Sequence, residues 1–256
     1  MTTRIACHGI TKSYGENVVL KDLDFWVDAG ELVTLVSPSG GGKTTLLNIL
    51  GGLTTADQGV VEVAGQDLSR LDEDGRAGLR RHAIGIVHQS SYLFPWLSVN
   101  ENLEIAPGSL APAPWLAEVR RNLGIDDFHD TEINKLSGGQ RRTIDFAAAL
   151  MAAPELLVLD EPTTGLDPVS KARLHDLILA RVDDDATIVM TTHDLAEAEH
   201  LASRVLIMNE GRIIADGTVT ALRERLDRGA EVTWIQDGAH HVHTTHCPER
   251  FVKELD

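Results

Sequence analysis

Cysteine, aromatic residues and positive charge are all scarce in this sequence of 256 residues. The two cysteines, Cys7 and Cys247, lie near opposite ends and form no CxxC pair, which excludes the paired-cysteine zinc and redox sites. A reducing, cytoplasmic compartment is therefore expected, and a disulfide between the two cysteines is the alternative. With 39 acidic against 23 basic residues, the net charge of −16 repels nucleic acid and anionic lipid, so we expect no nucleic-acid partner.

Long apolar runs are also missing. No uninterrupted apolar run reaches the ~18 residues that a membrane span needs, and no apolar signal segment follows Met1. Any role at a membrane is therefore expected to depend on a partner. Hydrophobic residues, 43% of the total, are nevertheless ample for one sizeable core, or for a core with a subdomain.

Short apolar runs recur along the chain, each bounded by turn or polar residues, and they are typical of buried strands. These runs span residues 32–36, 84–87, 156–159, 187–190 and 205–208. Segments with helical periodicity lie between them, at residues 44–50, 139–151, 169–181 and 195–202. This alternation predicts an α/β fold in which helices cover a mostly parallel sheet.

Three regions depart from this alternation. Residues 4–36 alternate between apolar and polar side chains with little helical signal, which predicts an N-terminal antiparallel β layer. Residues 90–135 contain several prolines and no convincing strand, which favours a helical insertion. Beyond Gly217 we predict a small appendage, made of a helix at 219–226, a strand pair at 231–235 and 241–245, and a closing helix from Pro248.

A glycine-rich segment follows the first predicted parallel strand and opens a helix; it reads Ser37-Pro38-Ser39-Gly40-Gly41-Gly42-Lys43-Thr44-Thr45. Its glycines let backbone N–H groups converge on phosphate oxygens, and the helix N-terminus adds a favourable dipole. Lys43 would supply positive charge to the phosphates, and the Thr44 hydroxyl suits Mg²⁺. The alternative is a connecting turn without a ligand. Ser37 stands where this pattern has glycine, which predicts a strained or rearranged start of the loop and leaves nucleotide affinity open.

Two adjacent carboxylates, Asp160 and Glu161, end the strand predicted at residues 156–159. They emerge at the carboxyl edge of the sheet, where ligands bind in α/β folds. We expect Asp160 to hold the Mg²⁺ shell and Glu161 to orient a water beside the γ-phosphate, because phosphoryl transfer depends on positioning and charge stabilisation. The alternative is a solvated acidic strand end.

A second helix start with anion-binding character reads Leu136-Ser137-Gly138-Gly139-Gln140. Ser137 is the predicted N-cap, and the two glycines leave backbone N–H groups bare. One ATP does not need two such sites. A phosphate loop, this motif and then a strand ending in carboxylates together resemble the nucleotide-binding domain of ATP-binding cassette (ABC) transporters, a P-loop NTPase fold with a helical subdomain, over residues 4–215.

The resemblance implies further site residues. Tyr14 matches the aromatic residue that stacks on adenine, with a surface turn tyrosine as the alternative. Gln89 matches the glutamine that reaches Mg²⁺ and the attacking water, and His193 matches the histidine that contacts the γ-phosphate. Asp167 matches the carboxylate of a loop that crosses between two subunits.

The resemblance also implies an assembly with ATP hydrolysis at its centre. Two cassettes, as a homodimer or as a paired cassette, face each other head to tail, and each ATP lies between Lys43 of one copy and Ser137 of the other. Transmembrane permease subunits are expected to dock near Gln89 and residues 93–96, at the cytoplasmic face of a bacterial inner membrane. For Phe94 and Trp96, interface contact and the core of the helical insertion are both open.

By the same resemblance the chain divides into three parts. Residues 1–88 and 152–217 would form a RecA-like ATP-binding core with the antiparallel layer. Residues 89–151 would form a helical subdomain that contains residues 136–140, called the signature motif below, and residues 218–256 the appendage. The stretch at 211–217 and the tail resemble cassettes of bacterial drug exporters. Residues 37–40 and 93–96 also resemble importers or lipoprotein- and macrolide-type exporters, and export is favoured.

Other signals are weaker. Arg141 and Asp145 have the i,i+4 spacing at which an ion pair forms on a helix. A tail with four histidines and a cysteine is expected to be a polar hairpin, and a metal site is the alternative; the residues are His240, His241, His243, His246 and Cys247. The rival to a transporter subunit is a soluble cassette ATPase acting on ribosomes or in DNA repair, but those proteins carry two cassettes or a coiled-coil insertion.

Overall fold

The computed structural model describes residues 3–38, 40–106, 113–183, 185–227, 230–236 and 239–245 of the chain. Its central layer is a six-stranded sheet in the order β10-β9-β3-β8-β7-β6. The strands are β3 (Leu32–Val36), β6 (Ile84–Val87), β7 (Leu156–Asp160), β8 (Thr187–Thr191), β9 (Arg204–Asn209) and β10 (Arg212–Gly217). All neighbouring strands are parallel except β9 and β10, so the predicted mostly parallel sheet is confirmed.

A second sheet is antiparallel and has the order β2-β1-β4-β5. Its strands are β1 (Thr3–Tyr14), β2 (Asn17–Asp28), β4 (Gln58–Val63) and β5 (Gln66–Asp67). The predicted N-terminal antiparallel layer is thus confirmed for β1 and β2. Two further strands, β4 and β5, join it from a region where the sequence indicated none.

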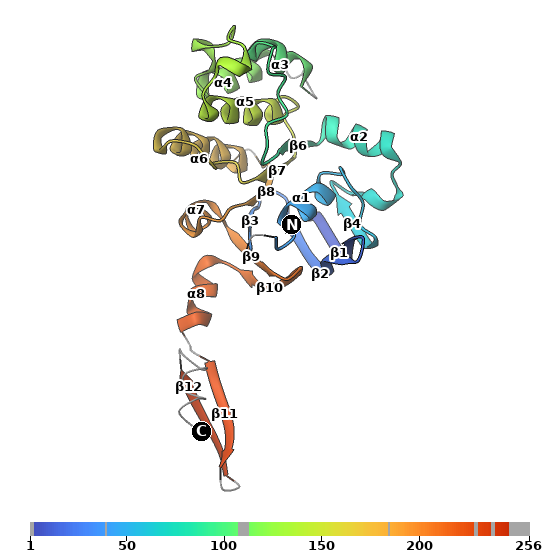
Figure 1. The fold of residues 1–256 in the computed structure, drawn as a ribbon, viewed down its shortest axis with the longest axis vertical. Helices are drawn as coiled ribbons and strands as arrows, with labels where there is room; N and C mark the ends of the chain where they lie inside the picture. Colours follow the sequence, from blue (N-terminus) through green and yellow to red (C-terminus); the bar gives the residue numbers. More distant parts are fainter. Residues whose placement is uncertain are drawn as a thin grey trace.

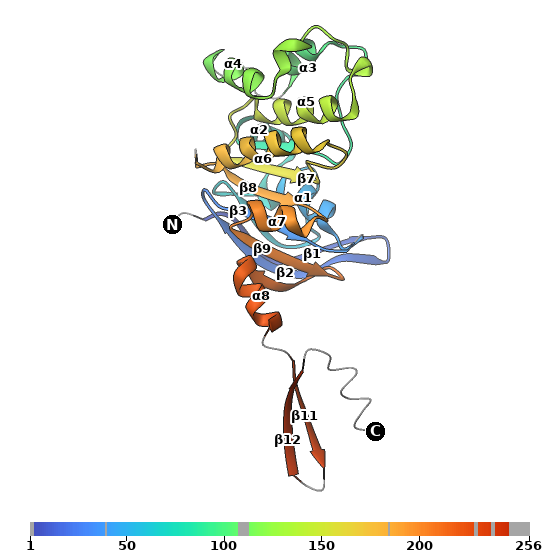
Figure 2. The same ribbon diagram turned by 90° about the vertical axis from the view of Figure 1, so that its left-hand side faces the viewer.

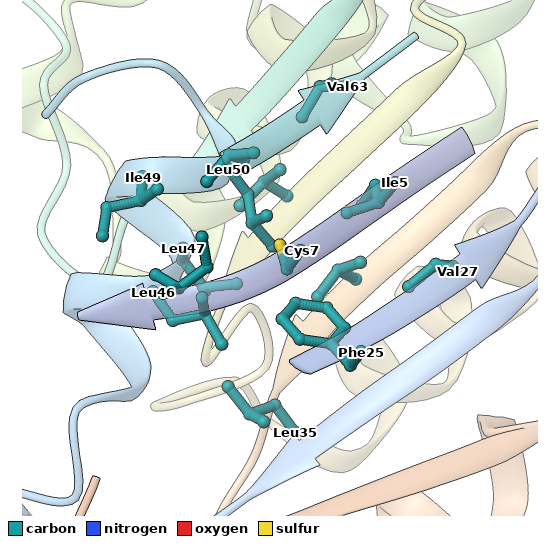
Figure 3. Packing of buried hydrophobic residues seen from close by; sticks show 14 of the residues in the cluster. Ile5, Cys7, Phe25, Val27, Leu35, Leu46, Leu47, Ile49, Leu50 and Val63 are labelled. Carbon is teal, nitrogen blue, oxygen red and sulfur yellow. The ribbon is translucent and has the colours of Figure 1, made fainter. Parts of the chain in front are cut away.

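Helix α1 (Lys43–Leu50) lies between the two sheets and fills the first hydrophobic core. Figure 3 shows Leu46, Leu47 and Leu50 of this helix pointing toward Cys7 of β1 and Phe25 of β2. Cys7 is fully buried there and has a free thiol. Burial of this apolar helix face anchors the start of α1, and therefore the phosphate loop before it, to both sheets.

The opposite face of the parallel sheet packs against a second core cluster. Strand β7 contributes alternately to the two clusters, with Leu156 and Val158 in the first and Leu157 and Leu159 in the second. Alternate side chains of a strand point to opposite faces, so β7 is buried on both sides, as parallel strands in α/β folds are. This burial accounts for the continuous apolar run that marked β7 in the sequence.

Helices α5 and α6 stack above this face of the sheet, with α3 and α4 farther out (Figure 2). Their bounds are α3 (Val99–Ile105), α4 (Ala113–Asn122), α5 (Gly138–Leu150) and α6 (Pro168–Asp183). The remaining helices before the C-terminal part are α2 (Glu73–His82), α7 (Leu195–Leu201) and the 3-10 turns η1 (Leu68–Arg70), η2 (Ile125–Asp127) and η3 (Ile133–Lys135). The described part of residues 90–135 contains helices and an isolated bridge between Ser98 and Glu132, but no named strand, as predicted.

The C-terminal part begins with α8 (Val219–Asp227), which contacts β10. Strands β11 (Ala230–Gln236) and β12 (Ala239–Thr245) then pair with each other in a separate two-stranded sheet (Figure 1), as predicted. His246, Cys247 and the helix predicted from Pro248 lie outside the described residues. No helix in the described ranges is long and apolar enough to cross a membrane.

Candidate nucleotide-binding site

A cleft of about 420 Å³ opens at the carboxyl edge of the parallel sheet. The structure brings together there four parts of the chain that the sequence analysis singled out separately: the glycine-rich loop, Gln89, Glu161 and His193. The loop contributes Ser37 and every residue from Gly40 to Thr45. Ser39, which was expected to bind nucleotide, lies outside the described residues.

The loop backbone depends on its glycines. Gly40 and Gly42 have φ angles of 77° and 95°, in the left-handed region that glycine adopts at little cost. A Cβ atom on Gly41 would lie 2.4 Å from Oγ of Ser37, closer than real atoms approach. Ser37 itself has no positive φ, and its side chain occupies space that a side chain on Gly41 would need. The strained or rearranged start of the loop that Ser37 predicts stays a prediction.

Lys43 folds back over the loop. Its Nζ donates to the carbonyl oxygen of Ser37 at 2.7 Å and, at longer range, to Oγ of Ser37 and the carbonyl of Pro38, both at 3.3 Å. All these acceptors are uncharged. A phosphate oxygen in the cleft would offer the ammonium a charged acceptor, and charge-assisted hydrogen bonds are roughly twice as strong as neutral ones.

Asp160 is buried, with 6% of its surface exposed, and it lines a pocket that shares Thr44 and Gln89 with the cleft. The Thr44 hydroxyl donates to its Oδ2 at 2.8 Å, and the Thr191 hydroxyl donates to its Oδ1 at 2.6 Å. Oxygen ligands of this kind, a carboxylate and a hydroxyl on adjoining elements, are those that Mg²⁺ prefers. The donor set of Thr44 and Asp160 therefore fits a magnesium ion.

Glu161 follows directly, with a φ of 48° that a non-glycine residue rarely adopts. Its backbone N–H donates to Oγ1 of Thr191 at 2.9 Å, and this bond holds the unusual conformation. Strain of ~1–3 kcal/mol is typical of such positions and is concentrated at functional sites. The carboxylate accepts a hydrogen bond from the Thr164 hydroxyl at 3.2 Å and faces Nδ1 of His193 at 3.5 Å.

The signature motif at the start of α5 does not line this cleft among the described residues. Ser137 caps the helix as predicted: its Oγ accepts from the N–H of Gln140 at 3.1 Å, and Oε1 of Gln140 accepts from the N–H of Ser137 at 2.9 Å. This capping box does not use the N–H groups of Gly138 and Gly139. Ser137 and Gly138 are exposed. The helix start therefore offers unused backbone N–H groups outside the cleft that Lys43 lines.

Two other predicted residues also lie apart from the cleft. Tyr14, at the end of β1, is 53% exposed, and Nζ of Lys12 lies 5.6 Å from the centre of its ring. Asp167 caps α6, where its Oδ1 accepts from the N–H groups of Val169 and Ser170 at 3.0 and 3.1 Å. The Ser170 hydroxyl also donates to it and lowers the pKa of Asp167 below the ordinary value.

The sequence analysis missed two residues that organise the site. One is Thr191, which bridges Asp160 and the backbone of Glu161. The register of the sheet pairs Asp160 with Thr191, so an alignment of β7 with β8 would have found it. The other is Arg142, a buried arginine on α5 whose guanidinium donates to the backbone carbonyls of Gln89 and Glu161. Its sequence position gives no sign of this role.

The ion pair considered between Arg141 and Asp145 does not form. Asp145 turns inward and its Oδ1 accepts from the Ser91 hydroxyl at 2.9 Å, while Arg141 is exposed. Burial raises the pKa of Asp145 to about 6. The carboxylate lies in the wall of a separate, mostly apolar groove of about 330 Å³, where Tyr92 and Phe94 also contribute.

The predicted docking patch lies partly at this groove. Phe94 lines it and is 47% exposed, and Trp96 is 70% exposed. Neither residue belongs to the hydrophobic cores of the described chain, so the alternative that they fill the core of the helical insertion was wrong.

The phosphate loop, the carboxylates on β7 and the histidine after β8 together define a nucleotide-triphosphatase site on a P-loop fold. The sequence profile of the family described as "ABC transporter" matches residues 20–164. Nod factor export ATP-binding protein I of Mesorhizobium japonicum is 36% identical over 248 residues, which are 94% of this chain and 70% of that protein. The chain belongs to the ABC transporter family.

Two further comparisons agree. A macrolide export ATP-binding/permease protein of Yersinia pestis is 36% identical over 225 residues, which cover 84% of this chain and 34% of that protein. Among solved structures, a dimeric ATP-binding cassette in a post-hydrolysis state with ADP and Pi superposes with a TM-score of 0.78 at 29% identity, over 84% of this chain and 98% of that one. The predicted P-loop NTPase fold and ATPase activity are confirmed, and the chain is an ATP-binding subunit of this transporter family.

Proposed function

We propose that two copies of this cassette face each other head to tail and bind ATP between them. In each site, Lys43 and the loop from Gly40 to Thr45 of one copy hold the phosphates from one side. Ser137 and the backbone N–H groups of Gly138 and Gly139 of the other copy hold them from the opposite side. The observation that carries this proposal is the separation of the two anion-binding helix starts: one lines the cleft, and the other is exposed with unused donors.

Within each site, the residues of the cleft divide the chemistry. Thr44 and Asp160 would hold Mg²⁺ with a contribution from Gln89, and the ion, when bound, would neutralise phosphate charge and orient the phosphates. Glu161 accepts the water's proton or orients that water for in-line attack. His193 contacts the γ-phosphate, which suits its exposed position beside Glu161. Tyr14 stacks on the adenine, and Asp167 faces the neighbouring copy.

The conformational change that ATP hydrolysis drives is transmitted to a transmembrane partner at the cytoplasmic face of the cell membrane. Two observations support this part. The relatives named above are export proteins, and in one of them the ATP-binding region belongs to a longer ATP-binding/permease chain. In this chain, the apolar groove with Tyr92 and Phe94 shares His88 and Ser90 with the pocket that Thr44, Gln89 and Asp160 line. A segment docked in the groove would therefore lie one pocket away from the phosphate loop. We therefore infer export through separate permease subunits.

Mixed dimers test the head-to-tail arrangement directly. K43A disables the phosphate loop and leaves the signature motif intact, whereas S137R blocks the signature motif and leaves the loop intact. Each variant alone is expected to hydrolyse ATP at less than about 1% of the wild-type rate. If ATP lies between copies, a mixture of the two variants forms heterodimers with one complete site, and hydrolysis returns to a measurable fraction of the wild-type rate.

Two outcomes of this experiment would contradict the head-to-tail arrangement. No recovery on mixing, with dimers demonstrated by light scattering, means that each chain forms its site alone. Full activity of S137R alone means that the signature motif does not contact ATP. For the partner, purification of the chain from its own cells is expected to recover a hydrophobic membrane protein with it, and recovery with ribosomes would contradict the proposal.

A further inference from the structure

Arg142 makes an unusually complete set of hydrogen bonds for a buried cation. Only 7% of its surface is exposed. Its Nε donates to the carbonyl of Pro162 at 3.0 Å, and Nη2 donates to the carbonyls of Asp160 and Glu161 at 2.7 and 2.5 Å. Nη1 donates to the carbonyls of His88 and Gln89, the latter at 3.2 Å. One side chain of α5 thus fastens two backbone segments that meet at the nucleotide cleft.

Only an arginine can make this connection. A guanidinium carries five N–H donors in a rigid planar fork, whereas a lysine ammonium has three donors around one atom. Burial lowers the pKa of Arg142, and the charges of Asp145, Asp160 and Glu161 oppose that effect. The cation therefore stays in place because carbonyl dipoles and nearby carboxylates replace the water that it loses.

Helix α5 makes a second hydrogen bond to the segment at residues 88–91. Asp145, one turn further along the helix, accepts from the Ser91 hydroxyl at 2.9 Å. Residues three apart on a helix share a face, so Arg142 and Asp145 reach the same segment side by side. The segment at residues 88–91 is thereby attached to α5 at both of its ends.

We propose that Arg142 is a positioning residue that couples the signature end of α5 to the hydrolytic groups of its own cleft. A rigid helix carries Ser137 at its start and Arg142 little more than one turn later. If Ser137 contacts the ATP of the partner copy, a shift of α5 moves the backbone of Gln89 and Glu161 in its own site. This inference rests on the proposed function, which gives Ser137, Gln89 and Glu161 their roles.

Substitution of the arginine by lysine tests the proposal. R142K keeps the positive charge but cannot reach both segments, so kcat for ATP is expected to fall at least about tenfold while the Kd for MgATP stays within about twofold. The matched control is R141K, the exposed neighbour on the same helix, which should change neither value. In a Q89A background the same R142K change should lower kcat less than it does in the wild-type chain, because one of the two side chains that Arg142 positions is already gone and only the effect through Glu161 is left.

A purely structural role predicts a different pattern. R142K would then lower the melting temperature, and its effect on kcat would be the same with and without Gln89; that result would overturn the inference. S91A changes an exposed residue and removes the second attachment. It should lower kcat about two- to fivefold at constant Kd, and it tests the inference independently if R142K folds poorly. No change in kcat with S91A and no dependence of R142K on Gln89 would likewise contradict it.

Two further variants distinguish a failure of the coupling role of Arg142 from a failure of the proposed function. If Q89A and E161Q themselves leave turnover unchanged, the assignment of the hydrolytic groups is wrong. If those two variants lose turnover and R142K does not, the assignment stands and only the coupling role of Arg142 fails.

Discussion

Nδ1 of His193 lies 3.5 Å from Oε2 of Glu161 at the rim of the nucleotide cleft. The two residues follow the ends of β7 and β8, which are neighbours in the parallel sheet. Because the carboxyl ends of parallel strands meet at one edge, strand pairing alone brings a carboxylate and an imidazole together there. The pair frames the position where a γ-phosphate and an attacking water would meet.

Replacement of Glu161 by glutamine removes the charge that would orient the water and preserves the shape of the side chain. E161Q is expected to lower steady-state ATP hydrolysis by about 10²–10⁴-fold and to leave ATP binding intact, so that an ATP-dependent dimer accumulates. Size-exclusion chromatography with light scattering, together with a phosphate-release assay, measures both effects. The exposed Glu62 on β4 provides the control, E62Q. Undiminished hydrolysis by E161Q would exclude its role.

Ser37 offers a test of how its hydroxyl affects nucleotide affinity. Glycine at this position keeps the carbonyl that binds Lys43 at 2.7 Å. It loses the longer contact of Lys43 with Oγ at 3.3 Å and the hydrogen bond that Oγ donates to the carbonyl of Pro38 at 3.0 Å. S37G should therefore change the Kd for MgATP by less than about threefold, which corresponds to ~0.6 kcal/mol. Titration calorimetry measures this, with K43A as the variant expected to weaken binding strongly. A change beyond tenfold would mean that the serine hydroxyl contacts the nucleotide or sets the loop geometry.

The hydroxyl of Thr191 makes hydrogen bonds to both Asp160 and Glu161. T191V keeps the shape of the side chain but leaves Oδ1 of Asp160 and the N–H of Glu161 without their hydroxyl partner. Buried groups left unpaired cost about 1–3 kcal/mol, so urea unfolding should show a loss of that size and hydrolysis should fall as Glu161 relaxes. T191S retains the hydroxyl and is expected to stay close to wild type. Equal losses in both variants would point to packing instead.

Asp145 should give the chain a measurable dependence of stability on pH. Burial raises its pKa from 3.8 to about 6 in the folded chain, so the folded state binds this proton more tightly than the unfolded state does. The free energy of unfolding therefore falls as pH rises from about 4 to about 6, and this contribution is flat above that range. Arg142 and the Ser91 hydroxyl already act on this carboxylate in the opposite direction.

D145N removes the titrating group and keeps an acceptor for Ser91. Between pH 5 and pH 8 the wild type should lose roughly 1 kcal/mol more stability than D145N, measured by urea unfolding at both pH values. S91A leaves the carboxylate in place and removes a hydrogen bond that lowers its pKa, so this matched control should keep or enlarge the pH dependence. Identical pH profiles for D145N and wild type would show that Asp145 does not titrate in this range.

The parallel sheet and the phosphate loop were predictable because their causes are local. Strands β3, β6, β7 and β8 are buried on both faces, so each appears in the sequence as a short continuous apolar run. The loop required Gly40 and Gly42 in the left-handed region, and glycines at those positions can be read directly. Strands β4 and β5 were not predicted because only Val61 and Val63 of β4 are buried and β5 is two residues long, so their apolar pattern is weak.

The amino-acid sequence by itself determined the chemistry: a loop that holds phosphate, a strand that ends in Asp160 and Glu161, a capped helix start at Ser137, and a family resemblance that these motifs share. Tertiary structure decided which of these groups meet. Sheet register placed Thr191 under Asp160, and burial turned Asp145 and Arg142 inward, where sequence spacing had suggested a surface pair with Arg141. Such contacts join residues far apart in the chain, and no local pattern encodes them.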